Sequence, residues 1–118
     1  MTDGRAPVLH YYETVDSEDP TAVVDLFSED AVYRRPGYQP MVGRAALLRF
    51  YGGERVIAAG RHVITRIVLD GPAHVAVEGR FIGHLKDGSR VDLGFADFFT
   101  LHDTLIVERA TYFEASAV

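Results

Sequence analysis

A single carboxyl group stands within an apolar stretch near the C-terminal end of the sequence. Asp97 lies in residues 91–99, whose aromatic and β-branched residues predict a strand. Because side chains alternate between the two faces of a strand, Asp97 shares its face with four apolar residues. These are Val91, Leu93, Phe95 and Phe99. Burying an unpaired carboxylate is costly, so we expect Asp97 to be protonated, to pair with an arginine, or to line a cavity and transfer protons there.

Composition narrows the possible classes of function. The chain has 118 residues, 47% of them hydrophobic, which suits a single domain over residues 1–118 with its own core. The absence of cysteine excludes disulfides and a cysteine nucleophile, and a net charge of -5 without a basic cluster argues against nucleic acid as a partner. No apolar run approaches the roughly 20 residues that span a bilayer, and the N-terminus lacks a signal-peptide pattern. We therefore expect no membrane association and a cytoplasmic location.

The sequence contains no motif that would hold a metal or a cofactor. The five histidines lack the spacing of metal ligands. His62 and His84 could line the entrance of a pocket, although a histidine that is solvated or bonded to its neighbours is the commoner case. No glycine-rich phosphate loop or nucleophile elbow is present. We expect neither a metal nor a cofactor.

The hydrophobic pattern predicts three helices in the first half of the chain. Apolar residues recur at helical spacing after Pro7, which predicts a helix over 7–16. Asp19 can cap a second, shorter helix that begins at Pro20. A third helix follows Gly43-Arg44, and a glycine pair weakens its end.

Strands account for most of the remaining chain. We expect a short strand over 31–35 and four longer ones, rich in β-branched and aromatic residues, over 62–69, 74–85, 90–101 and 104–113. Helices followed by an antiparallel meander predict an α+β fold. The expected sheet is curved into a cone, antiparallel or mixed, and the three N-terminal helices cover it and enclose a pocket.

Five local motifs accompany this order of elements. They are YYETVD at 11–16, FSEDAV at 27–32, VGR at 42–44, FADFF at 95–99 and YFE at 112–114. Together they resemble the nuclear transport factor 2 superfamily, in the branch that contains ketosteroid isomerase, limonene epoxide hydrolase and the SnoaL-like polyketide cyclases. The resemblance covers almost the whole chain. It implies the fold more strongly than the activity, because this fold hosts isomerases, hydrolases, cyclases, dehydratases and binding proteins.

The resemblance to ketosteroid isomerase implies one set of roles. In that family a tyrosine and a protonated aspartic acid bind the enolate oxygen while a second aspartate moves the proton. Tyr11 and Asp97 match the two oxyanion positions. Arg35 stands in place of the base, and arginine cannot act as a base at ordinary pH, which argues against classical steroid isomerisation. The alternative for Tyr11 is that it packs in the core as an amphipathic aromatic residue.

The other two families imply different chemistry. Limonene epoxide hydrolase is similar at Tyr33, where a tyrosine helps to hold the attacking water. At four other site positions, that family has residue types that differ from the ones in this chain. These positions are Arg35, Glu78, Arg80 and Thr111. Epoxide opening is therefore the less favoured activity. SnoaL-like cyclases carry an aspartate at the position of Asp97 that serves as acid and base in an aldol ring closure, which needs little more than one placed carboxyl and enolate stabilisation.

The register of the partner strand determines which charged residues share the pocket. In the family register, the inward residues of 74–85 are Glu78, Arg80, Ile82 and His84. The opposite set, which pattern alone would favour as the core face, is Val75, Val77, Gly79 and Phe81. Following the family register, we expect Glu78 to be a reserve base and the arginines to clamp an anionic oxygen. The alternative is a structural network of ion pairs.

The sequence thus predicts a small, cofactor-free enzyme that acts through an enolate on a hydrophobic carbonyl compound, by cyclisation or isomerisation. Its candidate catalytic residues are Asp97, Tyr11 and Glu78. Its candidate substrate-binding residues are Tyr33, Arg35, Arg80, Phe95, Arg109 and Phe113. The alternative is a protein that binds a small ligand or mediates association without catalysis. From the family we also expect a homodimer formed through the outer face of the sheet.

Overall fold

The computed structural model describes residues 3–55 and 57–115. Its elements are α1 (Arg5–Asp16), α2 (Pro20–Val24), β1 (Phe27–Arg34), β2 (Met41–Val42), α3 (Arg44–Arg49), η1 (Phe50–Glu54), β3 (Ile57–Asp70), β4 (His74–Leu85), β5 (Arg90–His102) and β6 (Leu105–Phe113). No helix within the described residues is long and apolar enough to cross a membrane.

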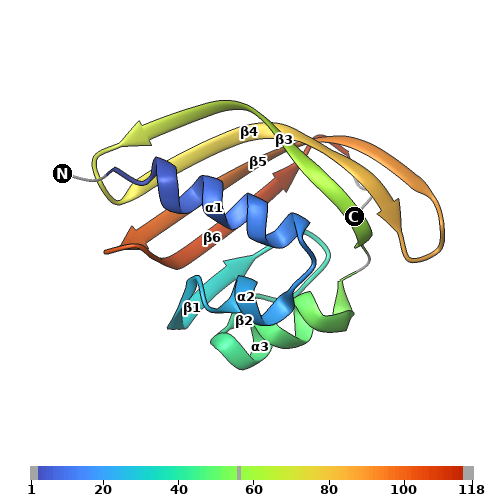
Figure 1. The fold of residues 1–118 in the computed structure, drawn as a ribbon, viewed down its shortest axis with the longest axis horizontal. Helices are drawn as coiled ribbons and strands as arrows, with labels where there is room; N and C mark the ends of the chain where they lie inside the picture. The colour runs from blue at the N-terminus through green and yellow to red at the C-terminus, as the bar shows by residue number, and fades with distance from the viewer. Residues whose placement is uncertain (1–2, 56, 116–118) are drawn as a thin grey trace.

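The six strands form one sheet in the order β2-β1-β6-β5-β4-β3. All neighbouring strands run antiparallel except β1 and β6, which run parallel, so the sheet is mixed. The sheet curves around α1, while α2 and α3 lie beside β1 and β2 (Figure 1). The predicted α+β fold, with three N-terminal helices against a curved sheet, is confirmed.

Helix α1 brings two adjacent tyrosines into the core. Its buried residues are Val8, Tyr11, Tyr12 and Val15, at the helical spacing that the sequence predicts. Pro7 lies in the first turn, where its missing N–H removes no helical hydrogen bond. The helix ends at Asp16, as predicted.

The boundary between α2 and β1 differs from the prediction. Asp19 caps α2 as expected, because its side chain accepts a hydrogen bond from the Ala22 N–H (3.2 Å). Strand β1, however, begins at Phe27, which the helical spacing had placed on α2. Ile106 of β6 pairs with Phe27 and donates its N–H to the Leu26 carbonyl (2.9 Å). Pairing with a distant strand therefore overrides the local helical pattern.

Helix α3 runs directly into the wide turn η1. The Arg55 N–H donates to the Phe50 carbonyl (3.1 Å), five residues earlier in the chain, which widens this turn relative to an α-helix. The expectation that the glycine pair Gly52-Gly53 weakens the helix is confirmed. The wide turn directs Phe50 and Tyr51 into the core.

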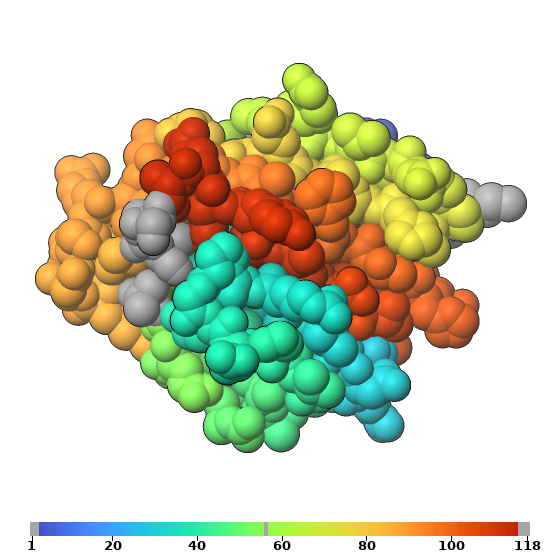
Figure 2. Space-filling view, turned by 180° about the vertical axis from the view of Figure 1, so that it is seen from behind, coloured from blue at the N-terminus to red at the C-terminus, as the bar shows by residue number. Residues whose placement is uncertain are grey.

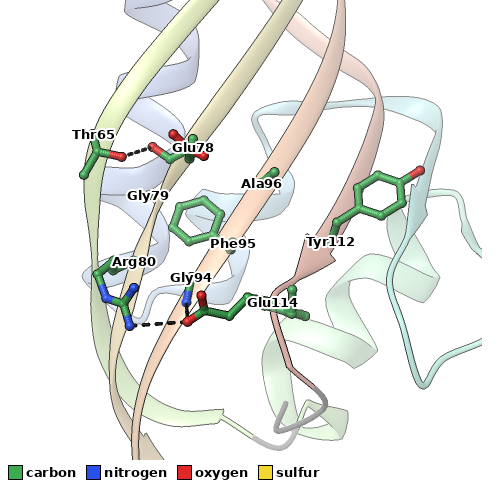
Figure 3. A pocket seen from close by; sticks show the side chains of 10 residues that line it. Thr65, Glu78, Gly79, Arg80, Gly94, Phe95, Ala96, Tyr112 and Glu114 are labelled. Carbon is green, nitrogen blue, oxygen red and sulfur yellow. Dashed lines mark hydrogen bonds and ion pairs between the residues drawn. The ribbon is translucent and has the colours of Figure 1, made fainter.

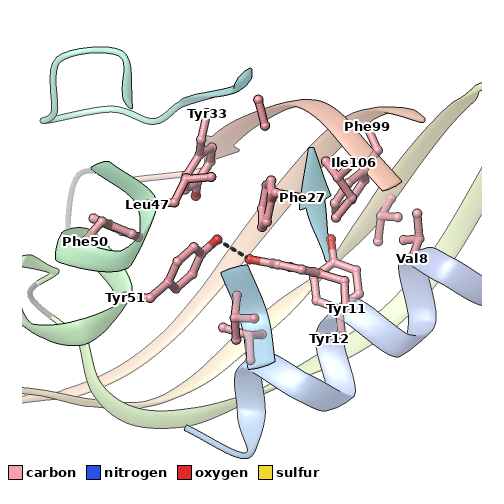
Figure 4. Close-up of a cluster of buried hydrophobic side chains, with 14 of the residues drawn as sticks. Val8, Tyr11, Tyr12, Phe27, Tyr33, Leu47, Phe50, Tyr51, Phe99 and Ile106 are labelled. Atoms are coloured by element: carbon pink, nitrogen blue, oxygen red, sulfur yellow. Dashed lines mark hydrogen bonds between the residues drawn. The ribbon is translucent and has the colours of Figure 1, made fainter. Parts of the chain in front are cut away.

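The core fills the space between α1, η1 and the inner face of the sheet (Figure 4). The largest side chains that are completely buried include Tyr11, Tyr33, Phe27, Phe50 and Phe99. Two of these five rings carry a hydroxyl group, and a buried hydroxyl needs a hydrogen-bond partner. In Figure 4 the hydroxyl groups of Tyr11 and Tyr51 point toward one another across the core.

Strand β4 turns the opposite face inward from the one expected. Val77 lies opposite Asp97 on β5, and residues that are directly opposite share a face of the sheet. The inward residues of β4 are therefore Val75, Val77, Gly79 and Phe81, and the outward ones Glu78, Arg80, Ile82 and His84. The family register was wrong for this strand because burying the apolar set removes more apolar surface from water and leaves the charges solvated.

Candidate functional site

Asp97 is the centre of a buried polar cluster. Its side chain is completely buried, and two donors meet its Oδ2 atom: the Tyr12 hydroxyl at 2.5 Å and Arg109 Nη2 at 2.8 Å. The Thr111 hydroxyl donates to Oδ1. As a carboxylate, Asp97 accepts from all three groups. Of the three possibilities for Asp97, pairing with an arginine is the one that the structure contains.

Arg109 divides its guanidinium group between Asp97 and two tyrosines. Nη2 donates to Asp97, while Nη1 donates to the hydroxyls of Tyr11 (2.6 Å) and Tyr51 (3.1 Å). The guanidinium carbon also lies 4.7 Å and 4.5 Å from the ring centres of Tyr11 and Tyr33, within the range of cation–π attraction. Burial opposes the charge, but Asp97 and the tyrosines raise the pKa of Arg109 well above its ordinary value. The group therefore remains a cation.

The Tyr11 and Tyr51 hydroxyls lie 2.6 Å apart, so one donates to the other. Both oxygens also accept a hydrogen bond from Arg109. The two hydroxyls carry two hydrogens, and the bond between them uses one. No other described residue accepts the second hydrogen. The pair therefore holds one hydroxyl hydrogen without an acceptor among the described residues.

A second chain of hydrogen bonds reaches Asp97 from β1. Thr111 gives its only hydroxyl hydrogen to Asp97, so the Tyr33 hydroxyl, 2.9 Å from Thr111 Oγ1, must donate to it. Tyr33 in turn accepts a hydrogen bond from Arg35 Nη1 (3.2 Å). Each group in this chain of hydrogen bonds therefore donates to the next: Arg35 to Tyr33, Tyr33 to Thr111, and Thr111 to Asp97.

Arg35 lies against three aromatic rings at one end of the cluster. Its guanidinium carbon is 5.7 Å from the ring centre of Tyr38, 5.3 Å from that of Phe50 and 5.0 Å from that of Phe113. Arg35 and Tyr51 are 8% and 7% exposed, whereas Asp97 is 0% exposed. The cluster is therefore closest to solvent on the side of Arg35 and Tyr51.

Three tyrosines of the cluster are held in the neutral form. Burial raises the pKa of Tyr51 to about 12, although Arg109 opposes the shift. Burial and the Asp97 charge raise the pKa of Tyr12 well above its ordinary value. Burial likewise raises the pKa of Tyr11, and Arg109 again opposes it. These hydroxyls are therefore hydrogen-bond donors at neutral pH.

Two of the candidate site residues lie outside the core. The side chains of Glu78 and Arg80 are 60% and 45% exposed on the outer face. Both help to line a hollow of about 470 Å³. Figure 3 shows that Arg80 points toward Glu114 there. Arg80 pairs with Asp92 (2.7 Å) and Glu114 (3.4 Å). The expectation that Glu78 and Arg80 line the interior is therefore wrong, and they form the ion pairs that were the alternative.

The remaining candidates converge in the core or at its edge. Tyr11, Tyr33, Arg109 and Asp97 belong to one hydrogen-bonded cluster, joined by Arg35 through Tyr33. Phe95 is 5% exposed and packs in the core, and Phe113 packs against Arg35. Within residues 3–55 and 57–115, no three histidine, aspartate or glutamate side chains come close enough to hold a metal ion.

Sequence reasoning did not assign roles to Tyr12, Tyr51 and Thr111. Tyr12 follows Val8 at a spacing of four, so helical periodicity alone places it on the buried face of α1. Thr111 lies two residues after Arg109 on β6, so strand geometry places both side chains on the same face. Tyr51 follows Leu47 at the same spacing of four as Tyr12 follows Val8, which predicts a buried position on the third helix, but its hydroxyl partners lie on distant elements and carry no local signal.

The buried pair predicts a large difference between two aspartate variants. Asp97→Asn should destabilise the protein by roughly 3–5 kcal/mol, because it leaves the Arg109 charge buried and uncompensated. The matched control is Asp92→Asn, which breaks the exposed pair with Arg80 and should leave stability almost unchanged. Denaturant unfolding curves measure both. Equal losses of stability in the two variants would contradict the assigned cluster.

The raised tyrosine pKa values predict how stability depends on alkaline pH. In the unfolded chain tyrosine ionises near pH 10, whereas Tyr51 in the folded state does so at about 12. Between these values the folded state binds more protons, so stability is fully present below about pH 10 and falls as pH rises further. Ultraviolet titration of tyrosinate should show Tyr11, Tyr12 and Tyr51 ionising late. Tyr51→Phe should remove one late step, and ionisation of all six together near pH 10 would rule out the buried cluster.

Comparison with known structures supports the same fold. A hypothetical protein with a ketosteroid isomerase-like fold from Catenulispora acidiphila DSM 44928, in complex with trimethylamine, is 21% identical, with a TM-score of 0.84 over 100% of this chain and 91% of that chain. A putative SnoaL-like polyketide cyclase from Jannaschia sp. CCS1 is 16% identical, with a TM-score of 0.79 over 92% of this chain and 83% of that chain. An LEH-like epoxide hydrolase from M. tuberculosis is 20% identical, with a TM-score of 0.78 over 92% of this chain and 80% of that chain.

Sequence comparison is decisive for the family. A search of curated proteins finds no match. The profile of the SnoaL-like domain, in contrast, matches residues 8–109, which span α1 to β6 and include Tyr11, Asp97 and Arg109. This protein therefore belongs to the SnoaL-like domain family.

Proposed function

We propose that this protein is an enzyme that stabilises the enolate of a hydrophobic carbonyl compound and thereby catalyses a cyclisation or an isomerisation. The observation that carries the proposal is the unused hydroxyl hydrogen of the Tyr11–Tyr51 pair beside the Arg109 cation. A fixed hydrogen-bond donor next to a fixed positive charge, in apolar surroundings, is what a developing oxyanion requires. Tyr11 and Tyr51 are then the groups that contact the enolate oxygen, and Arg109 supplies the positive charge behind them.

Asp97 has a different role in this proposal from the one expected from the sequence. Its carboxylate already accepts three hydrogen bonds, so it cannot donate one to an enolate. It orients Arg109 and Tyr12 and balances the guanidinium charge. Asp97 is therefore a positioning residue, which keeps the donors in place before the substrate binds.

The surroundings of the cluster favour a hydrophobic substrate. The side nearest solvent carries the rings of Tyr38, Phe50 and Phe113, with Arg35 among them. Aromatic rings around a few fixed polar groups are typical of small-molecule sites. An apolar carbonyl compound could rest on these rings with its oxygen toward Tyr51.

Similar structures support this class of chemistry, and details of the cluster rank its members. One protein of this fold is a putative SnoaL-like polyketide cyclase and another is an epoxide hydrolase. Epoxide opening has less support here, because the Tyr33 hydroxyl donates to Thr111 and is not available to hold a water as a donor. The second candidate function, ligand binding without catalysis, is favoured by the fact that Asp97 is fully engaged inside the protein.

Binding of 2-naphthol, a fused-ring phenol that mimics an enolate, tests the proposal. Because the protein contains no tryptophan, the fluorescence of the probe can be followed directly. We expect the ionised probe to bind more tightly than the neutral one, since Arg109 and the hydroxyl pair both favour an anion. Tyr11→Phe and Tyr51→Phe should each weaken binding by about threefold to tenfold, and the double variant by more, because only the double variant removes every free hydroxyl hydrogen.

Tyr112→Phe is the matched control for these variants. Tyr112 is 58% exposed on the outer face, so loss of its hydroxyl should leave 2-naphthol binding unchanged. Asp97→Asn should weaken 2-naphthol binding, because Arg109 and the hydroxyls of Tyr11 and Tyr51 would no longer be held in place. A double tyrosine variant that folds and binds 2-naphthol as the parent does would falsify the proposed oxyanion site.

We also propose that two copies of the chain associate through the outer face of the sheet. Figure 2 shows this face, where β6, in red, crosses between β5 and β1. Phe98 and Tyr112 are 53% and 58% exposed there, with ring centres 5.8 Å apart. Exposed pairs of both signs, such as Arg34 with Glu108 (3.1 Å), flank these rings. A face with a central aromatic patch and both charges at its sides is complementary to a second copy of itself.

The mass of the protein in solution tests this association. The parent should have twice the mass of the 13.1 kDa chain by light scattering, and Phe98→Glu should reduce it to the mass of one chain. The matched control is Leu48→Glu, at an apolar position on α3 that is 45% exposed, and it should remain dimeric. A monomeric parent, or a dimer that Phe98→Glu leaves intact, would contradict the proposal.

A further inference from the structure

An aspartate and a histidine form a second pair of titratable groups next to the Asp97 cluster. Asp16 is the last residue of α1, and His62 lies on β3. Both Asp16 oxygens contact His62: Oδ2 accepts the backbone N–H of His62 (2.9 Å), and Oδ1 lies 2.7 Å from Nδ1. The two side chains are 24% and 12% exposed. The contact at two points fixes both the place and the orientation of the imidazole ring.

This arrangement determines which ring nitrogen carries the hydrogen. A carboxylate can only accept hydrogen bonds, so Nδ1 of His62 must donate to Asp16. In the neutral ring Nε2 then carries a lone pair. No described residue donates a hydrogen bond to Nε2. Nε2 is also not among the described side-chain atoms that are both buried and without a hydrogen-bond partner, so it is not buried. Nε2 is therefore an open proton acceptor.

The ring lies against aromatic side chains of the core. Its centre is 5.0 Å from that of Tyr12, 5.1 Å from Phe81 and 5.2 Å from Phe95. Tyr12 connects the two polar groups, because its ring contacts His62 while its hydroxyl donates to Asp97. Tyr12 also packs against Tyr11, with ring centres 5.2 Å apart. Tyr12 thus contacts both His62 and Tyr11, whose hydroxyl belongs to the Tyr11–Tyr51 pair.

We propose that His62 is the general base of the enzyme and that Asp16 positions it. This inference rests on the proposed function, and it supplies the proton acceptor that Arg35 cannot be. A carboxylate that orients an imidazole also stabilises the imidazolium that forms when the ring takes a proton. His62 is then a catalytic residue, whereas Asp16 is a positioning residue.

The proposed step conserves atoms and charge. Nε2 of His62 takes a proton from a carbon next to the carbonyl group, and the electrons of the broken C–H bond form the enolate. The enolate oxygen receives the free hydroxyl hydrogen bond of the Tyr11–Tyr51 pair. The imidazolium then returns its proton to another carbon, which completes an isomerisation. In a cyclisation the enolate carbon bonds to a second carbonyl carbon of the same molecule, and the proton passes to the new alkoxide.

Exchange of deuterium into 2-tetralone, a fused-ring ketone with acidic hydrogens next to its carbonyl group, tests the base. In D₂O the parent should accelerate the exchange, and His62→Gln should lower the catalysed rate by about 100-fold or more. Binding of 2-naphthol to His62→Gln should remain as in the parent, which shows that the variant folds and keeps its oxyanion site. The matched control is His102→Gln, since His102 lies 3.7 Å from Asp103 but both are exposed. That variant should exchange at the parent rate.

A second variant separates catalysis from a structural tie between α1 and β3. Asp16→Asn can still hold the ring, but an amide can donate to Nδ1 and so move the hydrogen to Nε2. Nitrogen-15 NMR should show Nε2 of His62 without a hydrogen in the parent and with one in Asp16→Asn. The exchange rate should fall in this variant while 2-naphthol binding remains.

The outcomes distinguish this inference from the proposed function. Failure of the parent to bind 2-naphthol overturns the proposed function itself. If the parent binds 2-naphthol but does not catalyse deuterium exchange into 2-tetralone, the role of His62 is wrong and the oxyanion site stands. The same holds if His62→Gln catalyses the exchange at the parent rate. Hydrogen on Nε2 in the parent would also overturn it.

Discussion

The ion pair between Asp97 and Arg109 is the interaction on which the interior of this protein depends. Neither charge is stable alone in an apolar core, and each is stabilised by the other and by further polar partners. Asp97 accepts from Tyr12 and Thr111 as well as Arg109, so α1, β5 and β6 are tied at one carboxylate. The aromatic core can contain the Asp97 charge because three donors contact its two oxygen atoms.

Arg109 connects this structural requirement to chemistry. Nη2 of Arg109 pairs with Asp97, while Nη1 donates to the Tyr11 and Tyr51 hydroxyls. Placing these donors therefore needs no energy when a ligand arrives, because the ion pair holds them in the free protein. The cluster has its unused donor at Tyr11 and Tyr51, whereas the Thr111 hydroxyl donates to Asp97 and the Tyr33 hydroxyl donates to Thr111.

The order of the strands brings this cluster together. Strand β6 lies between β1 and β5, so Tyr33, Arg109 and Asp97 come from three adjacent strands although they are far apart in the sequence. Thr111 lies directly opposite Asp97, and Arg109 directly opposite Tyr33. The parallel pairing of β1 with β6 is thus the feature of the fold that joins the N-terminal and C-terminal halves of the site.

The sequence by itself determined the helices, the long strands and the inward face of β5, because periodicity and turn residues are local properties. It also singled out Asp97, since a carboxyl group at an apolar position needs partners, while the resemblance to known families pointed to Tyr11 and Tyr33. Only the tertiary structure decided which partners they have, that β4 turns Glu78 and Arg80 outward, and that β1 begins at Phe27. Tyr51 joins the cluster only through the wide turn η1. These features depend on contacts between distant segments, whose energies no local pattern contains.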